Sequence, residues 1–337
     1  MAGRTASEHG ITESRPRFVG SECRPRLTVA IIEIMTPQAT VVITTRNRKE
    51  DLRRAIQSCL EQDTDIEVLV FDDASTDGTS DMVQREFPNI RLLCSEQRVG
   101  YIALRNRGFE IANGEIVFSI DDDARFTDPS TVRQALQAFA EDATLGALAL
   151  RYTEPNRTAR QGYMPEVPSG TQLRNYIGCA HAIRVDAAKK MGGYREYLVH
   201  QGEERDMGIR MLQAGYCVRY LNSPPIIHDP SSIRDNSRMD YFGYRNTFLF
   251  DILNVPLPSL LYRLPLDTVL LLKHRLTFLD MPYRLTNTLR SLVACLWFVP
   301  LRAPVSRKTY GLYNSLPTHG AVDPRVLRSP TAGVGES

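Results

Sequence analysis

Ser119-Ile120-Asp121-Asp122-Asp123-Ala124-Arg125 is the stretch that decides the expected fold, because three acids follow directly on a short apolar run. Residues 115–120 (Glu-Ile-Val-Phe-Ser-Ile) are typical of a buried β-strand. Adjacent carboxylates repel one another, so their position at a strand end favours a divalent cation bound between them, and hard cations prefer oxygen ligands. A solvated, Asp-rich turn is the alternative interpretation.

Short strands and helices are expected to alternate around this stretch. Apolar runs predict further strands at 39–45, 66–71 and 90–94, and helical spacing predicts helices at 49–61, about 75–87 and 101–112. Such alternation predicts an α/β fold with a doubly wound, mostly parallel sheet. Because ligands of these sheets bind beyond the carboxyl ends of the strands, the polar clusters 44–47, 72–75 and 121–123 should face one crevice.

The pattern continues with longer connections. We expect helices at 132–141 and 203–214 and strands at 145–151, 175–184 and 216–221. The polar connection 152–174 is long for a compact domain and contains Pro and Gly, which predicts a mobile lid or an acceptor-binding loop.

Composition divides the chain into four parts. Residues 1–36 are polar and irregular, which predicts a disordered N-terminal extension, and residues 37–246 carry the strand–helix alternation. Residues 247–310 are expected to form a helical C-terminal region. The Pro/Gly/Ser-rich residues 311–337 predict a disordered tail.

The Leu-rich region 251–302 has two interpretations. Its apolar stretches 255–272 and 292–301 are both unlike a clean membrane span of roughly 20 apolar residues. Helices packed on the domain are one interpretation. The other is a helical pair lying against a membrane surface, with flanking cations available for anionic lipid. These cations are Lys273, Arg275, Arg284, Arg290 and Arg302.

Bulk composition limits the partners and the compartment. The chain has 337 residues, 42% of them hydrophobic, and a formal net charge of +2, so it lacks the sustained basic stripe expected of a nucleic-acid-binding protein. Its six cysteines are scattered without a CxxC pair or zinc-ligand spacing, which favours a reducing compartment. We therefore expect a cytoplasmic protein, with the inner face of the membrane as its place if residues 251–302 contact lipid.

Four motifs occur in an order and spacing that resemble the inverting glycosyltransferases of family 2, which have the GT-A fold. They are Thr44–Arg48, Phe71–Thr79, Gly100–Gly108 and Asp121–Asp123. The resemblance covers about residues 39 to 246 and implies a nucleotide-diphospho-sugar transferase domain at 37–246 with a C-terminal helical extension. It implies metal-dependent transfer of one sugar, from a UDP- or dTDP-sugar rather than other donors, to an acceptor hydroxyl in cell-surface or exopolysaccharide assembly. The Leu-rich region favours a lipid-linked acceptor over a free sugar.

The resemblance also implies a donor site. Thr44 and Arg46 correspond to residues beside the base and ribose, and Asp73 to the acid that accepts the imide N–H of uracil or thymine. Arg105 corresponds to a diphosphate contact, for which a planar, permanently charged guanidinium is suited. Turn capping is the alternative for Asp73, and a surface helical arginine is the alternative for Arg105.

A metal site is implied by the same comparison. Asp121 and Asp123 match the DxD motif, in which Asp123 would bind Mg²⁺ or Mn²⁺ and Asp121 would reach the ribose or the water shell of the metal. His228, in Ile226-Ile227-His228-Asp229, matches a late histidine that is a further metal or phosphate ligand. A hydrogen-bonded core histidine is the alternative.

Inversion requires a carboxylate that takes the proton of the acceptor hydroxyl. The acidic pair Glu203-Glu204 corresponds to the family's base, with Glu204 preferred and Glu203 as second choice, although Glu204 stands where the family has Asp. The run 241–246 resembles the aromatic-Arg-Asn motif that closes the domain. His181 and His200 are consistent either with the acceptor side or with packing.

Other function classes fit the sequence less well. Neither GxGxxG nor GxxxxGK[ST] occurs, which argues against a dehydrogenase and a P-loop enzyme. The QxxRW motif of processive polysaccharide synthases is also missing, so single-sugar transfer is favoured. A catalytically silent sugar-nucleotide-binding protein is the alternative from another class, but the intact acids argue against it.

Overall fold

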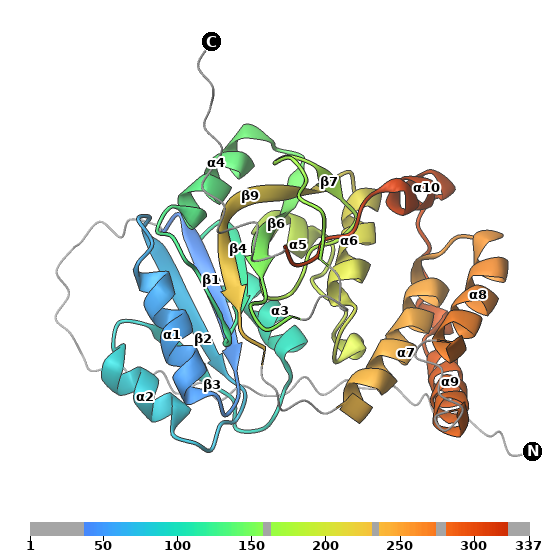
Figure 1. Cartoon of the computed structure of the whole chain (residues 1–337), viewed down its shortest axis with the longest axis horizontal. Coiled ribbons are helices and arrows are strands. Elements are labelled where there is room, and N and C mark those ends of the chain that lie inside the picture. Colours follow the sequence, from blue (N-terminus) through green and yellow to red (C-terminus); the bar gives the residue numbers. More distant parts are fainter. Residues whose placement is uncertain (1–36, 158–162, 231–235, 274–280, 323–337) are drawn as a thin grey trace, which may run out of the picture. The chain divides into compact units, whose positions relative to one another are not determined.

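The computed structural model describes residues 37–157, 163–230, 236–273 and 281–322 (Figure 1). The predicted N-terminal extension, residues 1–36, lies outside them. Strands of the described residues are β1 (Ala39–Thr45), β2 (Ile66–Asp72), β3 (Arg91–Cys94), β4 (Ile116–Asp121), β5 (Ala124–Arg125), β6 (Leu145–Thr153), β7 (Gln172–Leu173), β8 (His181–Arg184) and β9 (Cys217–His228). Helices are α1 (Lys49–Leu60), α2 (Thr79–Glu86), α3 (Tyr101–Ile111), α4 (Thr131–Glu141), α5 (Val185–Lys190), α6 (Glu203–Gln213), α7 (Asn236–Asn254), α8 (Ser259–Lys273), α9 (Met281–Leu296) and α10 (Arg307–Ser315).

One mixed sheet organises these elements, in the order β3-β2-β1-β4-β8-β6-β9-β5, with β7 added alongside β9. The strands β3, β2, β1 and β4 are parallel, and β6 is parallel to β9, whereas β8 runs antiparallel to β4 and β6. In the register, Thr44 of β1 lies opposite both Phe71 of β2 and Asp121 of β4. The carboxyl ends of these three strands therefore meet at one edge, and the predicted doubly wound, mostly parallel α/β sheet is confirmed.

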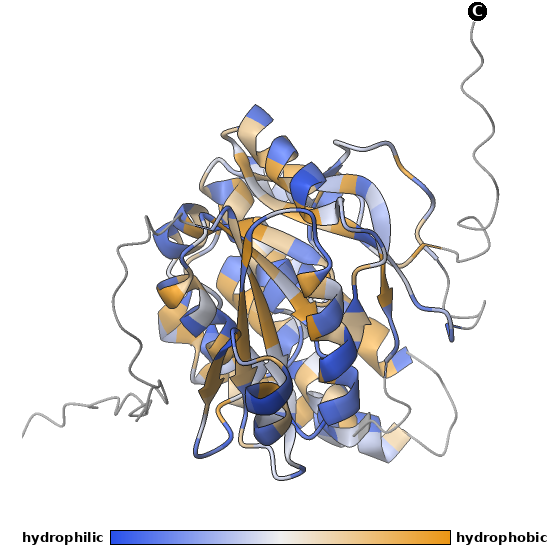
Figure 2. Cartoon of the chain, turned by 90° about the vertical axis from the view of Figure 1, so that its left-hand side faces the viewer, coloured by the Kyte–Doolittle hydropathy of each residue, from blue (hydrophilic) through white to orange (hydrophobic). Residues whose placement is uncertain are grey.

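Apolar side chains fill both faces of the sheet. One cluster joins β1 and β4 to α1, α2 and α4, and the other joins the opposite face to α3, α6 and α7. The strands are mainly hydrophobic in Figure 2, while the outer surfaces of the surrounding helices carry many hydrophilic residues. Burial of both faces explains why the strand sequences are apolar runs rather than alternating patterns.

Two predicted elements of the second half differ in length. The strand predicted at 175–184 is confined to His181–Arg184, preceded by an isolated bridge between Ile177 and Ala180. The strand predicted to end at residue 221 continues to His228, because its second half pairs with β6 and β5. The predicted loop 152–174 is shortened by β6 and β7, and its residues 158–162 lie outside the described parts.

The predicted C-terminal boundaries also need correction. The boundary between residues 246 and 247 falls inside α7, whose Phe248 and Leu249 are fully buried in the core of the α/β domain. Disorder from residue 311 is wrong for 311–322. There, α10 runs to Ser315, and Ala321 and Val322 are buried against the domain. Backbone hydrogen bonds from Met164 N to Ala321 O (2.8 Å) and from Val322 N to Tyr152 O (2.9 Å) fix this segment.

The helical C-terminal region is confirmed as α7 to α10. In the parts of the chain that the structure describes, none of the helices combines the length and the apolar composition needed to cross a membrane. Helices α8 and α9 pack against α7 and against each other.

A buried carboxyl pair lies where α7 meets α8. Asp251 and Asp267 are both buried, and Arg263 Nε lies 3.0 Å from Asp267 Oδ2 but 3.8 Å from Asp251 Oδ1. Burial, followed by repulsion from Asp267, raises the pKa of Asp251 to about 8. Asp251 is therefore protonated in the folded protein at pH values where it is ionised in the unfolded chain.

We predict that Asp251→Asn stabilises the protein at alkaline pH. Between the unfolded pKa and about pH 8, the folded state holds a proton that the unfolded state has lost, so the free energy of unfolding falls as pH rises. The amide removes this dependence. Tm of Asp251→Asn should exceed that of the wild type by several degrees, on the order of 5 °C, near pH 8 and by much less near pH 5.

Asp240→Asn, on an exposed position of the same helix, is the matched control and should change Tm little at either pH. An Asp251→Asn effect of the same size at both pH values would contradict the prediction.

Candidate active site

A cavity of about 520 Å³ opens at the edge where β1, β2 and β4 end. All the sequence-predicted site residues line it: Thr44, Arg46, Asp73, Arg105, Asp121, Asp123, Glu203, Glu204 and His228. The structure thus brings together residues that lie between positions 44 and 228 of the chain. Of the two histidines that the sequence left open, His200 lines the cavity. His181 is fully buried, with Nδ1 2.9 Å from Ile177 O and Nε2 3.1 Å from the Tyr194 hydroxyl, so packing is its role.

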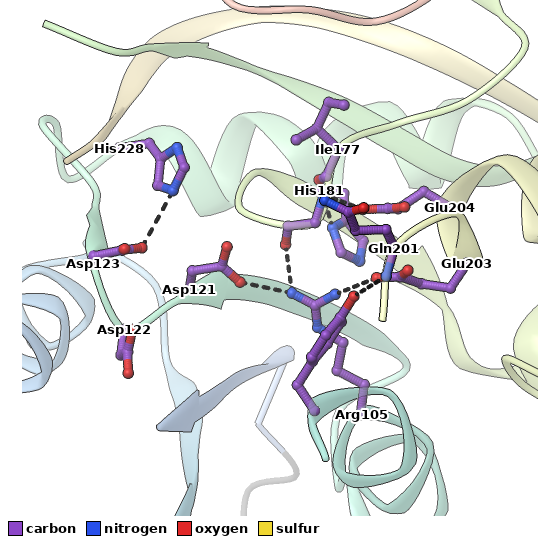
Figure 3. Close-up of polar contacts among 12 residues, drawn as sticks. Arg105, Asp121, Asp122, Asp123, Ile177, His181, Gln201, Glu203, Glu204 and His228 are labelled. Carbon is purple, nitrogen blue, oxygen red and sulfur yellow. Dashed lines mark hydrogen bonds and ion pairs between the residues drawn. The ribbon is translucent and has the colours of Figure 1, made fainter. Parts of the chain in front are cut away.

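The three consecutive acids point in different directions (Figure 3). Asp122 turns toward the loop after β1, where Thr45 Oγ1 donates to it at 2.9 Å and Arg48 Nη1 at 2.9 Å. Burial raises the pKa of Asp122 to about 7. Asp121 and Asp123 face the cavity, and Arg48 also contacts Asp123 at 2.6 Å.

Asp121, Asp123 and His228 form a group that could hold a metal ion. One ligand atom from each lies within 4.8 Å of the others. His228 Nε2 is 3.3 Å from Asp123 Oδ1, while its Nδ1 is 2.9 Å from Glu154 Oε1. Two carboxylates with one imidazole form a donor set that fits Mn²⁺, and Mg²⁺ through the carboxylates. His228 is half-buried and lines the cavity, with its ring between the carboxylates of Asp123 and Glu154.

Arg105 occupies the centre of the site. Its side chain is only 3% exposed, which rules out the surface-arginine alternative. Nη2 donates to Asp121 Oδ1 at 2.8 Å and to Gly178 O at 2.9 Å, and Nη1 lies 3.3 Å from Glu203 Oε1. A guanidinium buried away from water needs hydrogen-bond acceptors and opposite charges of this kind to offset its loss of hydration. Arg105 therefore links the end of β4 to the first turn of α6, and it also lines the cavity.

The acidic pair at the start of α6 divides into an inner and an outer carboxyl group. Glu203 is 1% exposed, and burial, followed by repulsion from Glu204, raises its pKa to about 8. Glu204 is partly exposed toward the cavity, and Gly178 N donates to its Oε1 at 3.0 Å. Burial raises the pKa of Glu204 as well. A Cβ at Gly178 would lie 3.0 Å from Glu204 Oε1 and 3.1 Å from Arg105 Nη1, so only glycine fits there without displacement.

Asp73 lies at the other end of the cavity. Its carboxylate accepts from Val99 N at 2.5 Å and from Gly100 N at 3.1 Å, so it fixes the loop before α3. Turn capping belongs instead to Asp72, which accepts from Ser75 N at 2.9 Å. A carboxylate has about four lone-pair positions, so Asp73 keeps capacity for a further donor.

Several cavity residues were missed by sequence reasoning. Arg48 lies inside the motif Thr44–Arg48 but was not predicted as a site residue. Three consecutive acids at a strand end need a nearby cation, and this need could have pointed to Arg48. No comparable signal marked four further cavity residues. Arg98 and Gln201 lie in the loops before α3 and α6, and Arg238 and Met239 lie in the first turn of α7. The sequence does not reveal that α7 reaches the cavity.

Hydrogen bonds from α7 hold residues 198–201, the loop before α6, in place. Asn246 Nδ2 lies 2.9 Å from Leu198 O, 2.8 Å from His200 O and 2.6 Å from Gln201 O. The neighbouring Arg245 Nε donates to Asn246 Oδ1 at 3.1 Å and so orients the amide. These contacts hold the segment that positions Glu203 and Glu204.

We predict that Asn246→Ala lowers the free energy of unfolding by about 1–3 kcal/mol, because buried carbonyls lose their donor. It should also increase amide hydrogen exchange around residues 198–201. Thr247→Ala is the matched control, since Thr247 Oγ1 bonds only Gly243 O of its own helix among the described contacts. Equal stability losses in both variants would contradict the assigned role.

Comparison with known proteins identifies a family and several similar chains. The model of the family described as "Glycosyl transferase family 2" matches residues 40–198. The N-acetylglucosaminyl-diphospho-decaprenol L-rhamnosyltransferase of Mycobacterium tuberculosis is 25% identical over 260 residues, which cover 64% of this chain and 84% of that protein. The O-antigen biosynthesis protein RfbC of Myxococcus xanthus is 23% identical over 259 residues, which cover 68% of this chain. This chain spans only 20% of the length of RfbC and 27% of that of Escherichia coli chondroitin synthase.

Solved structures share the fold. A mannosyltransferase of Pyrobaculum calidifontis, in complex with GDP-Man and Mn²⁺, superposes with a TM-score of 0.53 at 19% identity, covering 87% of this chain and 83% of that chain. S. aureus TarS in complex with UDP-GlcNAc superposes with a TM-score of 0.52 at 16% identity, covering 76% and 71% of the two chains. Residues 40–198 therefore belong to glycosyl transferase family 2, and the chain has the GT-A fold.

Proposed function

We propose that this protein is an inverting, metal-dependent glycosyltransferase that moves one sugar from a UDP- or dTDP-sugar to an acceptor hydroxyl in cell-surface polysaccharide assembly. The observation that carries the proposal is that one cavity holds both the Asp121–Asp123–His228 group and the carboxylate of Glu204. Arg105 bonds Asp121 and the Gly178 carbonyl, and the N–H of Gly178 donates to Glu204. A cation site beside a positioned carboxylate is what displacement of a diphosphate by a hydroxyl requires.

The donor would lie across the cavity from Asp73 to His228. Asp73 suits the imide N–H of uracil or thymine, and Thr44 and Arg46 line the same end. Asp121, Asp123 and His228 would hold Mg²⁺ or Mn²⁺, with Nδ1 of His228 donating to Glu154 so that Nε2 faces the cation. A bound cation supplies charge neutralisation to the departing diphosphate. The known complexes with Mn²⁺ and GDP-Man or with UDP-GlcNAc support a nucleotide-diphosphate sugar as donor class.

Glu204 would act as the general base. The acceptor oxygen forms a bond to the anomeric carbon, the bond from that carbon to the diphosphate oxygen breaks, and the hydroxyl proton passes to Glu204. Attack opposite the leaving group inverts the configuration. Burial, followed by repulsion from Glu204, raises the pKa of the more buried Glu203 to about 8, which favours its neutral form near pH 7. Arg105 would hold Asp121 and Glu203 in place and present its cationic end to the diphosphate side.

A lipid-linked acceptor at the cytoplasmic face of a membrane completes the proposal. Two relatives carry names that specify acceptors on a diphospho-polyprenol, the Mycobacterium rhamnosyltransferase and a Campylobacter jejuni glucosyltransferase 35% identical over 92 residues. No disulfide links the cysteines of the described residues, which is compatible with a reducing compartment.

We predict that two substitutions separate donor binding from transfer. Asp123→Ala should abolish the Mn²⁺-dependent part of UDP- or dTDP-sugar binding, measured by calorimetry with and without Mn²⁺. Glu204→Gln should bind the donor as the wild type does and lose transfer by about 100-fold or more, because the amide cannot accept the proton. Asp81→Ala, on an exposed position of α2 outside the cavity, is the control.

Near-normal transfer by Glu204→Gln would move the base to Glu203 or elsewhere. Donor binding by the wild type without turnover of any donor, in the presence of Mn²⁺, would support a silent sugar-nucleotide-binding protein instead.

We predict an acidic limb in the pH profile of transfer. Burial raises the pKa of Glu204, and a protonated carboxyl group cannot accept the hydroxyl proton. Activity (kcat/KM) should therefore fall as pH decreases through this pKa, measured between about pH 5 and pH 9. Glu204→Asp should retain the limb, whereas the residual activity of Glu204→Gln should lack it. An unchanged limb in Glu204→Gln would assign it to another group.

A further inference from the structure

Helix α9 has the reverse of the polarity expected for a helix at a protein surface in water. Its buried residues are Arg284, Asn287, Thr288, Ser291 and Cys295. Its exposed apolar residues include Leu285, Leu289, Val293 and Leu296, with Leu289 53% and Val293 60% exposed, and Thr286 and Arg290 are its exposed polar residues. A helix in water buries its apolar stripe and exposes its polar face. The outward face of α9 is therefore suited to an apolar environment.

The buried side of α9 reinforces this reading. Asn287 Nδ2, Thr288 Oγ1 and Ser291 Oγ have no hydrogen-bond partner among the described residues. Burying polar atoms in this way costs free energy that turning the helix toward water would recover. This rotation of α9 is favourable only if its exposed leucines and Val293 contact an apolar partner. That contact would offset the free energy lost by burying the polar atoms.

Helix α8 and the segment after α9 also expose apolar side chains. The fully buried residue of α8 is Asp267, whereas Leu261, Tyr262, Leu266 and Leu270 are exposed. Beyond α9, Trp297 is 83% exposed, followed by exposed Val299 and Leu301. So many exposed apolar side chains on two helices that pack against each other mark a protein or membrane contact. We call the exposed apolar residues of 257–273 and 281–301 the apolar face.

Charge distinguishes among the occupants of the apolar face. In residues 255–273 and 281–308 the only acid is Asp267, which is buried beside Arg263. The exposed charges there are cations, Lys273, Arg290, Arg307 and Lys308. A second copy docked through the same face around a two-fold axis would bring these cations together. An apolar surface whose exposed charges within the described residues 255–273 and 281–308 are all cations is instead complementary to anionic lipid.

We propose that the apolar face docks on the surface of an anionic lipid bilayer, with its leucines, Val293 and Trp297 entering the headgroup–acyl boundary. The proposal rests on the proposed function only in that a lipid-linked acceptor would then be presented near the cavity. Helix α7 joins the two sites: Arg238 and Met239 of its first turn line the cavity, and Tyr241 meets the Arg290 guanidinium of α9 at 5.5 Å.

Trp297 is the chain's single tryptophan and so reports directly on the apolar face. The full chain is mixed with vesicles of phosphatidylglycerol and phosphatidylethanolamine, or of phosphatidylcholine alone, and its emission spectrum and co-sedimentation are measured. We expect a shift of emission to shorter wavelength and protection from acrylamide with the anionic vesicles, weakened about tenfold or more by the double charge reversal Lys273→Glu/Arg290→Glu.

Leu289→Glu and Val293→Glu should each abolish co-sedimentation, whereas Leu60→Glu, at a 57% exposed leucine of α1, should not. Circular dichroism and Tm confirm that the variants are folded. Asp123→Ala should bind vesicles like the wild type, so failure of vesicle binding and failure of the proposed transfer reaction are distinguishable.

Three results would overturn the proposal. The first is an unchanged Trp297 spectrum with anionic vesicles. The second is equal binding by Leu289→Glu and the wild type. The third is a concentration-dependent dimer that shields Trp297 without lipid and is broken by Leu289→Glu, which would assign the apolar face to a second copy of the chain.

Discussion

The buried guanidinium of Arg105 is the interaction on which the rest of the site depends. Its partners come from three separate segments: the end of β4, the turn at Gly178 and the first turn of α6. A charge removed from water is tolerated only where such partners surround it, and removal of one leaves the others uncompensated. The spacing between the acidic end of β4 and the acids of α6 is therefore set by one side chain of α3.

Two carboxyl groups adjacent in sequence acquire different properties from this arrangement. Successive residues of a helix point about 100° apart, so one of Glu203 and Glu204 must turn inward when α6 packs on the sheet. The inward group is Glu203, which is desolvated, while Gly178 N supports Glu204 at the cavity. Environments that separate the pKa values of two neighbouring acids are how a site assigns them different roles.

Local sequence patterns were sufficient for the strands and loops at the sheet edge, because apolar runs and polar strand ends are encoded within a few residues. The direction of Asp122 was not predictable, since it depends on Arg48, 74 positions earlier, and on the turn between β4 and β5. The sequence also left open which of Glu203 and Glu204 is the base, because it does not show which of the two packs inward. The ordered segment up to Val322 was missed because a Pro/Gly/Ser-rich composition says nothing about docking on Tyr152 and Met164, more than 150 residues away.

The return of residues 316–322 to β6 has a consequence for how the helical pair is attached. Helix α7 enters the α/β core before α8, and the segment after α10 rejoins that core through Tyr152 and Met164. The chain is therefore attached to the α/β core both before and after the pair α8–α9, so this pair is not a free C-terminal extension. A doubly tethered element has few orientations relative to the sheet, so the cavity mouth would keep a defined angle to any surface on which the pair rests.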